Sequence, residues 1–435
     1  MEHSKKEVMI IFFITYQFLQ LCIPLPVFAC YLLWRKLKGK PAFGSLKERC
    51  GFVPKSDKTK EVVWIHAVSV GEIFSIQHFV KQLKNQNPNV FCFVTTGTIT
   101  GKQIAQKHLN ADCVSFLPYD FLPSILLGYH RINPSRVFVV ESELWPNLLM
   151  LAKYKKIPLY SINARVSARS FARLKTFSFI FKELLNLFQN IFTQTQEDKK
   201  RFEVLGVKEN KLKVFGNIKT FNVLQKQQEQ KNWVLESKII LNKKDSVLLV
   251  GSLHPGELDI YLRLFKELRV TNKNIKLILA PRHFNWKKEL IEKVKATGFT
   301  YNVWDETLQE DFDKQDILLV CMLGKLFDLY KISDIFFLGG TFVPVGGHNL
   351  LEPAVWKKVS IVGPHIQNCK TIADDLEKNN ALIKVADEIE LQKIVKDLLQ
   401  DSERRIQMGE NAFEWLTREA NIVGKNLREL GKLFN

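Results

Sequence analysis

The 435-residue chain lacks several motifs that would assign a function at once. It has no G-x-x-x-x-G-K-[ST] loop, which argues against a P-loop nucleotidase, and no H-x-x-x-H or H-E-x-x-H pair for a catalytic zinc ion. Its seven cysteines are an odd number and include no C-x-x-C pair, so neither a disulfide framework nor a zinc ribbon is expected. This cysteine usage fits a reducing compartment, and nothing in the sequence requires a metal ion.

Charge is absent from Val8 to Trp34, a run long enough to cross a bilayer at about 20 residues per span. Pro24 and Pro26 would kink or split such a span. A cleaved signal peptide is the alternative, but the run is longer than a typical h-region and has no clear small-x-small cleavage site, so we favour a retained anchor. Four basic residues follow directly, whereas the two lysines before the run are balanced by two glutamates, and the positive-inside rule therefore places the body in the cytoplasm.

Acidic residues are in deficit elsewhere, because 63 Lys and Arg face 45 Asp and Glu, which gives a formal net charge of +18. Such a charge requires an anionic partner. Nucleic acid is one candidate, yet no helix-turn-helix, RNP or zinc-finger signature accompanies the charge, and anionic lipid of the inner membrane is the simpler partner. Residues 163–185 interleave Arg and Lys with phenylalanine. This segment could lie on a bilayer or grip a phosphorylated lipid, or form a basic helix whose aromatic side chains face the core.

Short apolar runs alternate with longer helical patterns after residue 34, which is typical of a parallel α/β sheet covered on both faces. The predicted strands lie at 62–67, 90–96, 137–142 and 158–164, and then at 246–252, 275–281, 316–322, 334–340 and 359–363. A polar stretch at 225–232 separates the two sets, and residues 402–434 are expected to be helical. The sequence therefore predicts an anchor in residues 1–34 and two Rossmann-like domains, residues 35–220 and 221–435, with a ligand cleft between the carboxyl ends of their strands.

The segment from Asp334 to Pro353, DIFFLGGTFVPVGGHNLLEP, runs from an apolar strand through two glycine pairs into a helix. Glycine lets the backbone approach a ligand closely, and the free N–H groups of a helix start attract phosphate oxygens. Glu352 in the first turn could accept hydrogen bonds from two ribose hydroxyls. The alternative is a glycine turn before a helix with a favourable first-turn acid.

Polar residues follow the predicted strands of the first domain. Glu72 in HAVSVGE could take a proton from an attacking hydroxyl, or it could simply be a helix-start glutamate. The helix dipole would lower the pKa of Glu72 and burial would raise it. ESELWPN adds Glu141 and Glu143, and placing two acids so close costs electrostatic repulsion, which indicates a functional role. Lys219 in GNIK could neutralise charge that develops during a reaction, or it could be a solvated lysine.

The second domain offers groups for phosphate. Arg282 in PRH provides a guanidinium fork, and GSLHPGE provides Ser252 and another helix start. His254, His283 and His348 lie in the same loops, where we interpret them as hydrogen-bonding residues rather than ligands.

Seven blocks taken together resemble the Kdo transferases of Gram-negative bacteria, which move 3-deoxy-D-manno-oct-2-ulosonic acid (Kdo) from CMP-Kdo onto a lipid A precursor. The blocks occur in order between the predicted anchor and about residue 375: WIHAVSVGE (64–72), ESELWPN (141–147), NARVSARS (163–170), GNIK (216–219), GSLHPGE (251–257), APRH (280–283) and GGHNLLEP (346–353). The resemblance implies a GT-B glycosyltransferase that inverts the anomeric centre, needs no metal or other cofactor, and works on the cytoplasmic face of the inner membrane. It also implies an acceptor site in the N-terminal domain and a CMP-sugar site in the C-terminal domain.

The resemblance further implies roles for individual residues. Glu72 matches the proton acceptor, and Glu143 and Lys219 match residues that stabilise the transition state. The segments that match CMP-contacting segments comprise Pro281, Arg282, Leu323, Gly324, Lys325, Asn349, Leu350, Leu351 and Glu352. The block at 323–326 reads L-G-K-L where family members commonly have M-G-E-L, which leaves any role of that acid open.

Two other functions stay compatible with the sequence. One is a different membrane-associated GT-B transferase that uses a UDP-sugar and a lipid acceptor. The other is a membrane-tethered protein that binds an anionic ligand without catalysis. The sequence does not determine how many Kdo residues are added, whether the anchor fully spans the bilayer, or the oligomeric state.

Overall fold

The computed structural model describes residues 13–20, 45–176, 178–229, 241–242, 244–305 and 315–431. The chain forms two compact units, the first made of Met1–Asn222 with Ala420–Asn435 and the second of Val223–Glu419. Residues 13–20 form a helix, and the rest of the predicted anchor (Val8 to Trp34) lies outside the described residues. Within the described ranges, no helix is both long and apolar enough to cross a bilayer.

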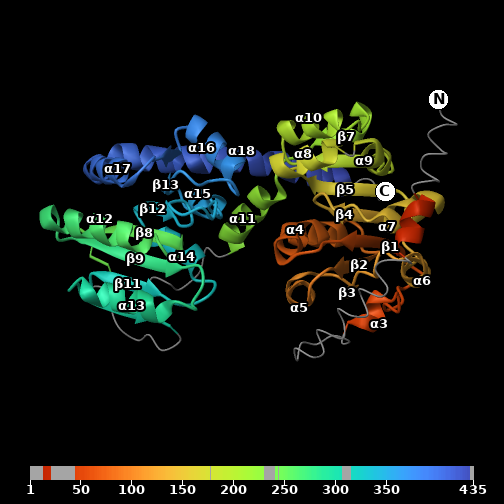
Figure 1. Ribbon diagram of the computed structural model, residues 1–435, viewed down its shortest axis with the longest axis horizontal. Helices are drawn as coiled ribbons and strands as arrows, with labels where there is room; N and C mark the ends of the chain where they lie inside the picture. Colours follow the sequence, from red (N-terminus) through yellow and green to blue (C-terminus); the bar gives the residue numbers. More distant parts are fainter. Residues whose placement is uncertain are drawn as a thin grey trace. The chain divides into compact units, whose positions relative to one another are not determined.

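The first unit is built on a seven-stranded parallel sheet with helices on both faces (Figure 1). Its strands are β1 (Glu61–His66), β2 (Val90–Thr96), β3 (Cys113–Phe116), β4 (Arg136–Val140), β5 (Leu159–Ala164), β6 (Asn190–Thr193) and β7 (Leu212–Val214), in the order β3-β2-β1-β4-β5-β6-β7. Its helices are α3 (Leu46–Arg49), α4 (Val70–Gln86), α5 (Ile99–His108), α6 (Leu122–Ile132), α7 (Pro146–Tyr154), α8 (Ala168–Thr176), α9 (Ser178–Leu185), α10 (Gln196–Val204) and the 3-10 turn Glu209–Lys211. Helix α11 (Ile218–Glu229) begins in the first unit and continues into the second.

Strand β1 shows why this sheet carries helices on both sides. Trp64 packs into one hydrophobic core, whereas Val63 and Ile65 pack into a second core on the other face. Successive side chains of a strand point to opposite faces, so a strand that is apolar throughout needs cover on both.

The second unit repeats this architecture with another seven-stranded parallel sheet. Its strands are β8 (Ser246–Leu253), β9 (Ile275–Pro281), β10 (Tyr301–Trp304), β11 (Ile317–Val320), β12 (Ile335–Leu338), β13 (Val359–Val362) and β14 (Leu382–Lys384), in the order β10-β11-β9-β8-β12-β13-β14. Its helices are α12 (Leu258–Thr271), α13 (Lys287–Ala296), α14 (Leu326–Ile332), α15 (Leu351–Val355), α16 (Lys370–Lys378), α17 (Glu388–Gln400) and most of α18 (Ser402–Gly431).

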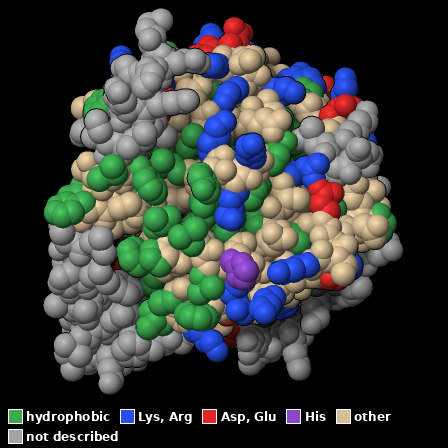
Figure 2. Space-filling view, turned by 90° about the vertical axis from the view of Figure 1, so that its right-hand side faces the viewer, with side chains coloured by type: hydrophobic (Ala, Val, Ile, Leu, Met, Phe, Trp, Pro, Cys, Tyr) green, Lys and Arg blue, Asp and Glu red, His purple; other side chains and the backbone are tan. Residues whose placement is uncertain are grey.

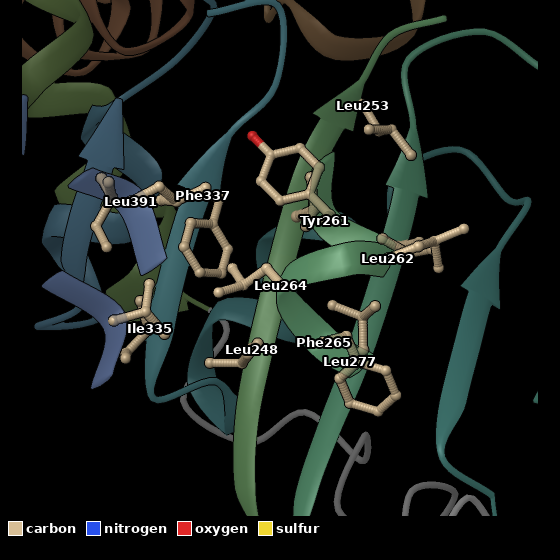
Figure 3. Packing of buried hydrophobic residues seen from close by; sticks show 14 of the residues in the cluster. Leu248, Leu253, Tyr261, Leu262, Leu264, Phe265, Leu277, Ile335, Phe337 and Leu391 are labelled. Atoms are coloured by element: carbon tan, nitrogen blue, oxygen red, sulfur yellow. The ribbon is translucent and has the colours of Figure 1, made fainter. Parts of the chain in front are cut away.

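Helix α12 packs on the middle of this second sheet. Its buried residues recur at the spacing of one helical face, and Figure 3 shows Tyr261 and Leu264 beside Phe337 of β12. The rings of Tyr261 and Phe337 lie 5.5 Å apart. Burying one such side chain stabilises the fold by roughly 1.5–3 kcal/mol, so α12 is fixed firmly and the loop that precedes it is held in place.

The end of α18 belongs to the first unit, whereas the sequence predicts a second domain of residues 221–435. Val423 and Leu427 lie in the core of the first unit, and the amide Nδ2 of Asn426 donates to the carbonyl oxygen of Phe215 at 2.9 Å. The periodicity of α18 predicted a helix correctly, but a helical pattern does not say which core its apolar face enters.

Candidate active site

Glu72 lies at the junction between β1 and α4, where the sequence places a serine and a glutamate three residues apart. Ser69 is the N-cap, its hydroxyl donates to Oε1 of Glu72 at 2.8 Å, and the Val68 N–H donates to Oε2 at 2.8 Å. This is a variant of the capping box. The Glu72 side chain is only 7% exposed.

Burial is the largest influence on the pKa of Glu72. It raises the pKa of Glu72 above its ordinary value of 4.5, the charge of Glu141 adds to the rise, and the hydrogen bonds from Val68 and Ser69 oppose it. The sequence left open whether the helix start or burial would dominate, and in the structure burial does. A carboxyl group with a raised pKa is better matched to accepting a proton near neutral pH than an ordinary solvated one.

Two further acids follow β4. Glu141 adopts a left-handed backbone conformation with φ of +59°, which is uncommon for a residue with a side chain and turns the chain sharply after the strand. Burial raises the pKa of Glu143, and the charges of Glu72 and Glu141 raise it further. The three carboxyl groups therefore lie within electrostatic reach of one another at the carboxyl edge of the sheet.

Two cations offset this acidic group. The Lys219 Nζ lies 3.7 Å from Oε1 of Glu141, and the Arg165 Nε lies 3.3 Å from Oε2 of the same carboxylate. The predicted catalytic set of Glu72, Glu143 and Lys219 is thus brought together, but Lys219 forms its ion pair with Glu141. The sequence pattern indicates Arg165 only as part of the basic segment 163–185.

The second unit gathers basic groups where β8, β9 and β12 end. Nε2 of His254 lies 2.8 Å from Nε2 of His348, and the two rings stack with their centroids 5.1 Å apart. Burial and the charge of Arg282 lower the pKa of His348 to about 4, and burial lowers the pKa of His254 as well. Arg282 itself is exposed, and no carboxylate in the described part of the chain pairs with it. An anion placed there would be attracted to the guanidinium and would favour protonation of the imidazoles.

The glycine-rich loop after β12 is held by Glu257, which the sequence analysis did not single out. This carboxylate is fully buried, and its two oxygens accept four backbone N–H groups. Oε2 accepts from His254 at 3.0 Å and from Gly340 at 2.7 Å, and Oε1 accepts from Thr341 at 3.0 Å and from Phe342 at 2.9 Å. Glu257 therefore joins the β8–α12 loop to the β12–α15 loop.

Close backbone packing explains one glycine of this loop. A Cβ at Gly339 would lie 2.2 Å from the carbonyl oxygen of Ser252, so a residue with a side chain cannot stand there without moving β8. Ser252 has φ of +58°, which turns its backbone toward the glycine. The predicted binding residue Ser252 thus lies against the glycine loop.

Glu352 lies in α15 and is largely enclosed. Burial raises its pKa above 4.5, although Lys226 of α11 lies 3.8 Å from its Oε1 and opposes the rise. The Lys226 Nζ also lies 3.7 Å above the ring of Phe327. Helix α15 has only five residues, and the side-chain oxygen of Asn349 already accepts the N–H of Leu351 at 3.0 Å. Fewer N–H groups are therefore free to bind phosphate at this helix start than the sequence predicts.

Residues 44–222 match the sequence profile of a family described as 3-deoxy-D-manno-octulosonic-acid transferase (kdotransferase). A 3-deoxy-D-manno-octulosonic acid transferase of Chlamydophila psittaci is 30% identical over 394 residues, which are 87% of this chain and 89% of the relative. A protein of the same name from Haemophilus influenzae is 30% identical over 408 residues, which are 92% of this chain and 94% of the relative. The chain belongs to the Kdo transferase family. Members of this family are glycosyltransferases, so the chain is an enzyme of that class.

The solved UDP-GlcNAc 2-epimerase of Neisseria meningitidis, bound to UDP-GlcNAc, has the same fold. It matches with a TM-score of 0.61 over 85% of this chain and all of that chain, at 14% identity. An identity this low supports the fold alone. The predicted GT-B type of two parallel-sheet α/β domains is confirmed, and the predicted membrane anchor stays a prediction.

The remaining residues of the predicted nucleotide site lie at strand ends and helix starts of this Kdo transferase. Pro281 ends β9 and is buried, and Leu350 is the N-cap of α15. Leu323 is 79% exposed, Gly324 has φ of +81°, and Lys325 lies with its Nζ 5.7 Å from the ring centre of Trp304. A lysine at 325 therefore covers an aromatic ring at the position where relatives were expected to carry an acid. Within the described chain, no three His, Cys, Asp or Glu side chains are grouped to hold a metal ion.

Proposed function

We infer that this Kdo transferase moves Kdo from CMP-Kdo to a lipid A precursor by direct displacement, with inversion at the anomeric carbon. The observation that carries the inference is the environment of Glu72, an enclosed carboxyl group with a raised pKa, beside two more acids and two cations. Glu72 removes the proton from an acceptor hydroxyl, the hydroxyl oxygen attacks the anomeric carbon, and CMP leaves with the bonding electron pair.

Charge compensation accounts for the roles of the neighbouring groups. Lys219 balances negative charge that develops during transfer, and Glu143 stabilises positive charge on the sugar ring. Because Lys219 is already oriented by Glu141 at 3.7 Å, little reorganisation is needed when the substrates bind.

The basic groups of the second unit support CMP-Kdo as donor. Arg282 and the imidazoles of His254 and His348 lie at the ends of adjacent parallel strands, where ligands of such folds bind. Glu352 would accept hydrogen bonds from the ribose hydroxyls, with the ligand displacing Lys226 from the carboxylate. We propose no metal or other cofactor for the reaction.

The helix of residues 13–20 supports contact with a lipid bilayer, which we propose to be the cytoplasmic face of the inner membrane. Its polar residues Tyr16, Gln17 and Gln20 hydrogen bond to the first unit, whereas Ile14 and Phe18 are 61% and 64% exposed. A helix with its polar stripe toward the protein and an apolar stripe outward is suited to lipid hydrocarbon. Figure 2 views the molecule from this side, and hydrophobic side chains gather there beside lysines and arginines, as expected for contact with anionic lipid.

The direct test is incubation of the full chain with CMP-Kdo and a tetraacylated lipid A precursor, followed by mass spectrometry of the products. We expect wild-type protein to add Kdo, and the product masses give the number added. Glu72→Gln should reduce the rate by about two to four orders of magnitude, the usual cost of losing a general base. Glu197→Gln is the matched control, because Glu197 is an exposed acid of the same unit in a surface ion pair.

Three outcomes would contradict the proposal. Equal rates for wild type and Glu72→Gln would remove Glu72 from the base role. Tighter binding of UDP than of CMP in calorimetry, with no Kdo product, would favour a transferase that uses UDP-sugars instead. Steeply salt-dependent ligand binding with no transfer at all would favour a non-catalytic binding protein.

A further inference from the structure

Asp120, in the loop between β3 and α6, holds together three parts of the first unit. Its side chain is 7% exposed, and its carboxylate accepts three hydrogen bonds. The N–H of Asn147 donates to Oδ2 at 3.0 Å, the N–H of Leu148 donates to Oδ1 at 2.9 Å, and the hydroxyl of Tyr16 donates to Oδ2 at 2.9 Å.

The two N–H groups belong to the first turn of α7. The N–H groups of a helix start have no partner within the helix, and the N-cap residue Trp145 provides no side-chain acceptor. Pro146, which comes next, has no N–H at all. Asp120 therefore caps α7 from a segment 27 residues before Asn147. A negative charge at this end is also favoured by the helix dipole.

Glu143 lies only three residues before α7. The position of the segment that carries Glu143 depends on where α7 begins, because the chain between Glu143 and Pro146 is too short to absorb a displacement. A shift of α7 would thus move one member of the acidic group around Glu72.

The helix of residues 13–20 completes the same network. Nε2 of Gln20 donates to the carbonyl oxygen of Asp120 at 2.7 Å, and Nδ2 of Asn147 donates to Oε1 of Gln20 at 3.2 Å. Gln17 donates to the side-chain oxygen of Asn147, which is completely buried. Asn147 and Asp120 would be left with unsatisfied polar groups if the N-terminal helix moved away, and such groups are costly in a buried place.

We propose that Asp120 is a positioning residue through which the seated helix of residues 13–20 sets the geometry of the Glu143 segment. Transfer activity then depends on the N-terminal helix being docked. This inference rests on the proposed function only in its catalytic consequence, because the effect on α7 is expected without any substrate.

The test uses the full chain in detergent micelles and three substitutions. Asp120→Asn removes the charge and leaves an amide that cannot accept both N–H groups well. Tyr16→Phe deletes only the hydroxyl that reaches Asp120 and keeps the ring. Thr15→Val is the matched control, because it removes a hydroxyl from the exposed side of the same helix.

Hydrogen exchange of the Asn147 and Leu148 amides is measured first, without substrates. Loss of a helix cap typically favours local opening about fivefold, so exchange at these amides should rise by about that factor in Asp120→Asn, rise less in Tyr16→Phe, and not change in Thr15→Val. Unchanged exchange in both Asp120→Asn and Tyr16→Phe would overturn the proposal.

Kinetics of Kdo transfer are measured second. Asp120→Asn should lower kcat by about tenfold, since small displacements of catalytic groups are expensive, while the KM for CMP-Kdo stays the same. Tyr16→Phe should also lower kcat. Because it is the milder change, it keeps the test valid if Asp120→Asn folds poorly. Faster exchange with kcat unchanged would refute the positioning role. If the wild-type protein transfers no Kdo, the proposed function is refuted. Faster amide exchange in Asp120→Asn and Tyr16→Phe would then still support the link between Asp120 and α7.

Discussion

Replacing Glu257 by glutamine should destabilise the second unit strongly, although the two side chains have nearly the same shape. Each carboxylate oxygen accepts two backbone N–H groups, from His254 and Gly340 or from Thr341 and Phe342. An amide keeps one accepting oxygen and turns an NH2 group toward the other pair. Two buried N–H groups would then lose their acceptor and face a donor.

The size of the effect follows from these two groups. A buried donor without a partner costs about 1–3 kcal/mol, so Glu257→Gln should reduce the free energy of unfolding by about 2–6 kcal/mol. With a urea m-value of about 2–3 kcal/mol/M, the midpoint of the second unit's transition should fall by about 1 M or more. The affinity for CMP should fall as well, because the same N–H groups belong to the glycine loop.

Urea denaturation followed by circular dichroism, with calorimetric titration of CMP, would measure both effects. Glu289→Gln is the control, since Glu289 is an exposed acid of the same unit whose carboxylate lies 3.8 Å from Lys293. A surface pair of this kind contributes about 0–1 kcal/mol. A midpoint shift for Glu257→Gln no larger than that of Glu289→Gln would refute the role of Glu257 as the anchor of the two loops.

Three further predictions concern pH. Burial lowers the pKa of His66 to about 4 from an ordinary 6.5, so the stability that the neutral imidazole contributes is complete above pH 6.5 and is lost as pH falls toward 4. Urea denaturation at successive pH values should show a loss of up to about a few kcal/mol in the free energy of unfolding, and His66→Gln should flatten this dependence. The pKa of Glu72 is raised above 4.5, so kcat/KM should begin to fall at a higher pH than it would with an ordinary glutamate as base. A kcat/KM profile that stays flat down to pH 4.5 would contradict the assignment of Glu72 as the base. Burial and Arg282 lower the pKa of His348 to about 4, so an anion bound beside Arg282 should raise this pKa and cause the imidazole to take up a proton. CMP should therefore bind more tightly at pH 6 than at pH 8. Calorimetry in two buffers of different ionisation enthalpy measures the proton uptake, and finding none would exclude this coupling.

The long central strands could be predicted from the sequence, and the edge strands could not. The predicted run at 62–67 corresponds to β1, and the run at 275–281 coincides with β9. The strands that were missed are β3, β7, β10 and β14, which are the four edges of the two sheets, and the short inner strand β6. A central parallel strand is apolar on both faces over its whole length, whereas these edge strands have only three or four residues and are partly exposed, so they leave no long apolar run to detect.

Site residues were predictable where a polar group directly follows a central strand, and less so where the partner comes from a distant segment. Arg282 follows β9 immediately, and the parallel sheet fixes its place. Lys219 pairs with Glu141, whose backbone is left-handed, rather than with Glu143, and no local sequence pattern indicates either feature. Asp120 and Lys226 act on residues 27 and 126 positions away, and spacing alone carries no signal for such contacts.

Glu72 and Glu257 show most clearly what sequence pattern alone does not distinguish, because each directly follows a glycine at the start of a helix that comes after a strand. Glu257 has no exposed surface and four N–H donors, which use all the acceptor sites of a carboxylate. Glu72 has two donors and two acidic neighbours, so it keeps free acceptor sites and a reason to take up a proton. Glutamine at position 72 can still accept from Val68 and donate to the Ser69 hydroxyl, so Glu72→Gln should lower stability far less than Glu257→Gln while lowering the transfer rate far more. Opposite rankings in the denaturation and transfer assays would therefore separate an anchoring glutamate from a reacting one, and equal rankings would mean that the number of donors around the carboxylate does not decide its role.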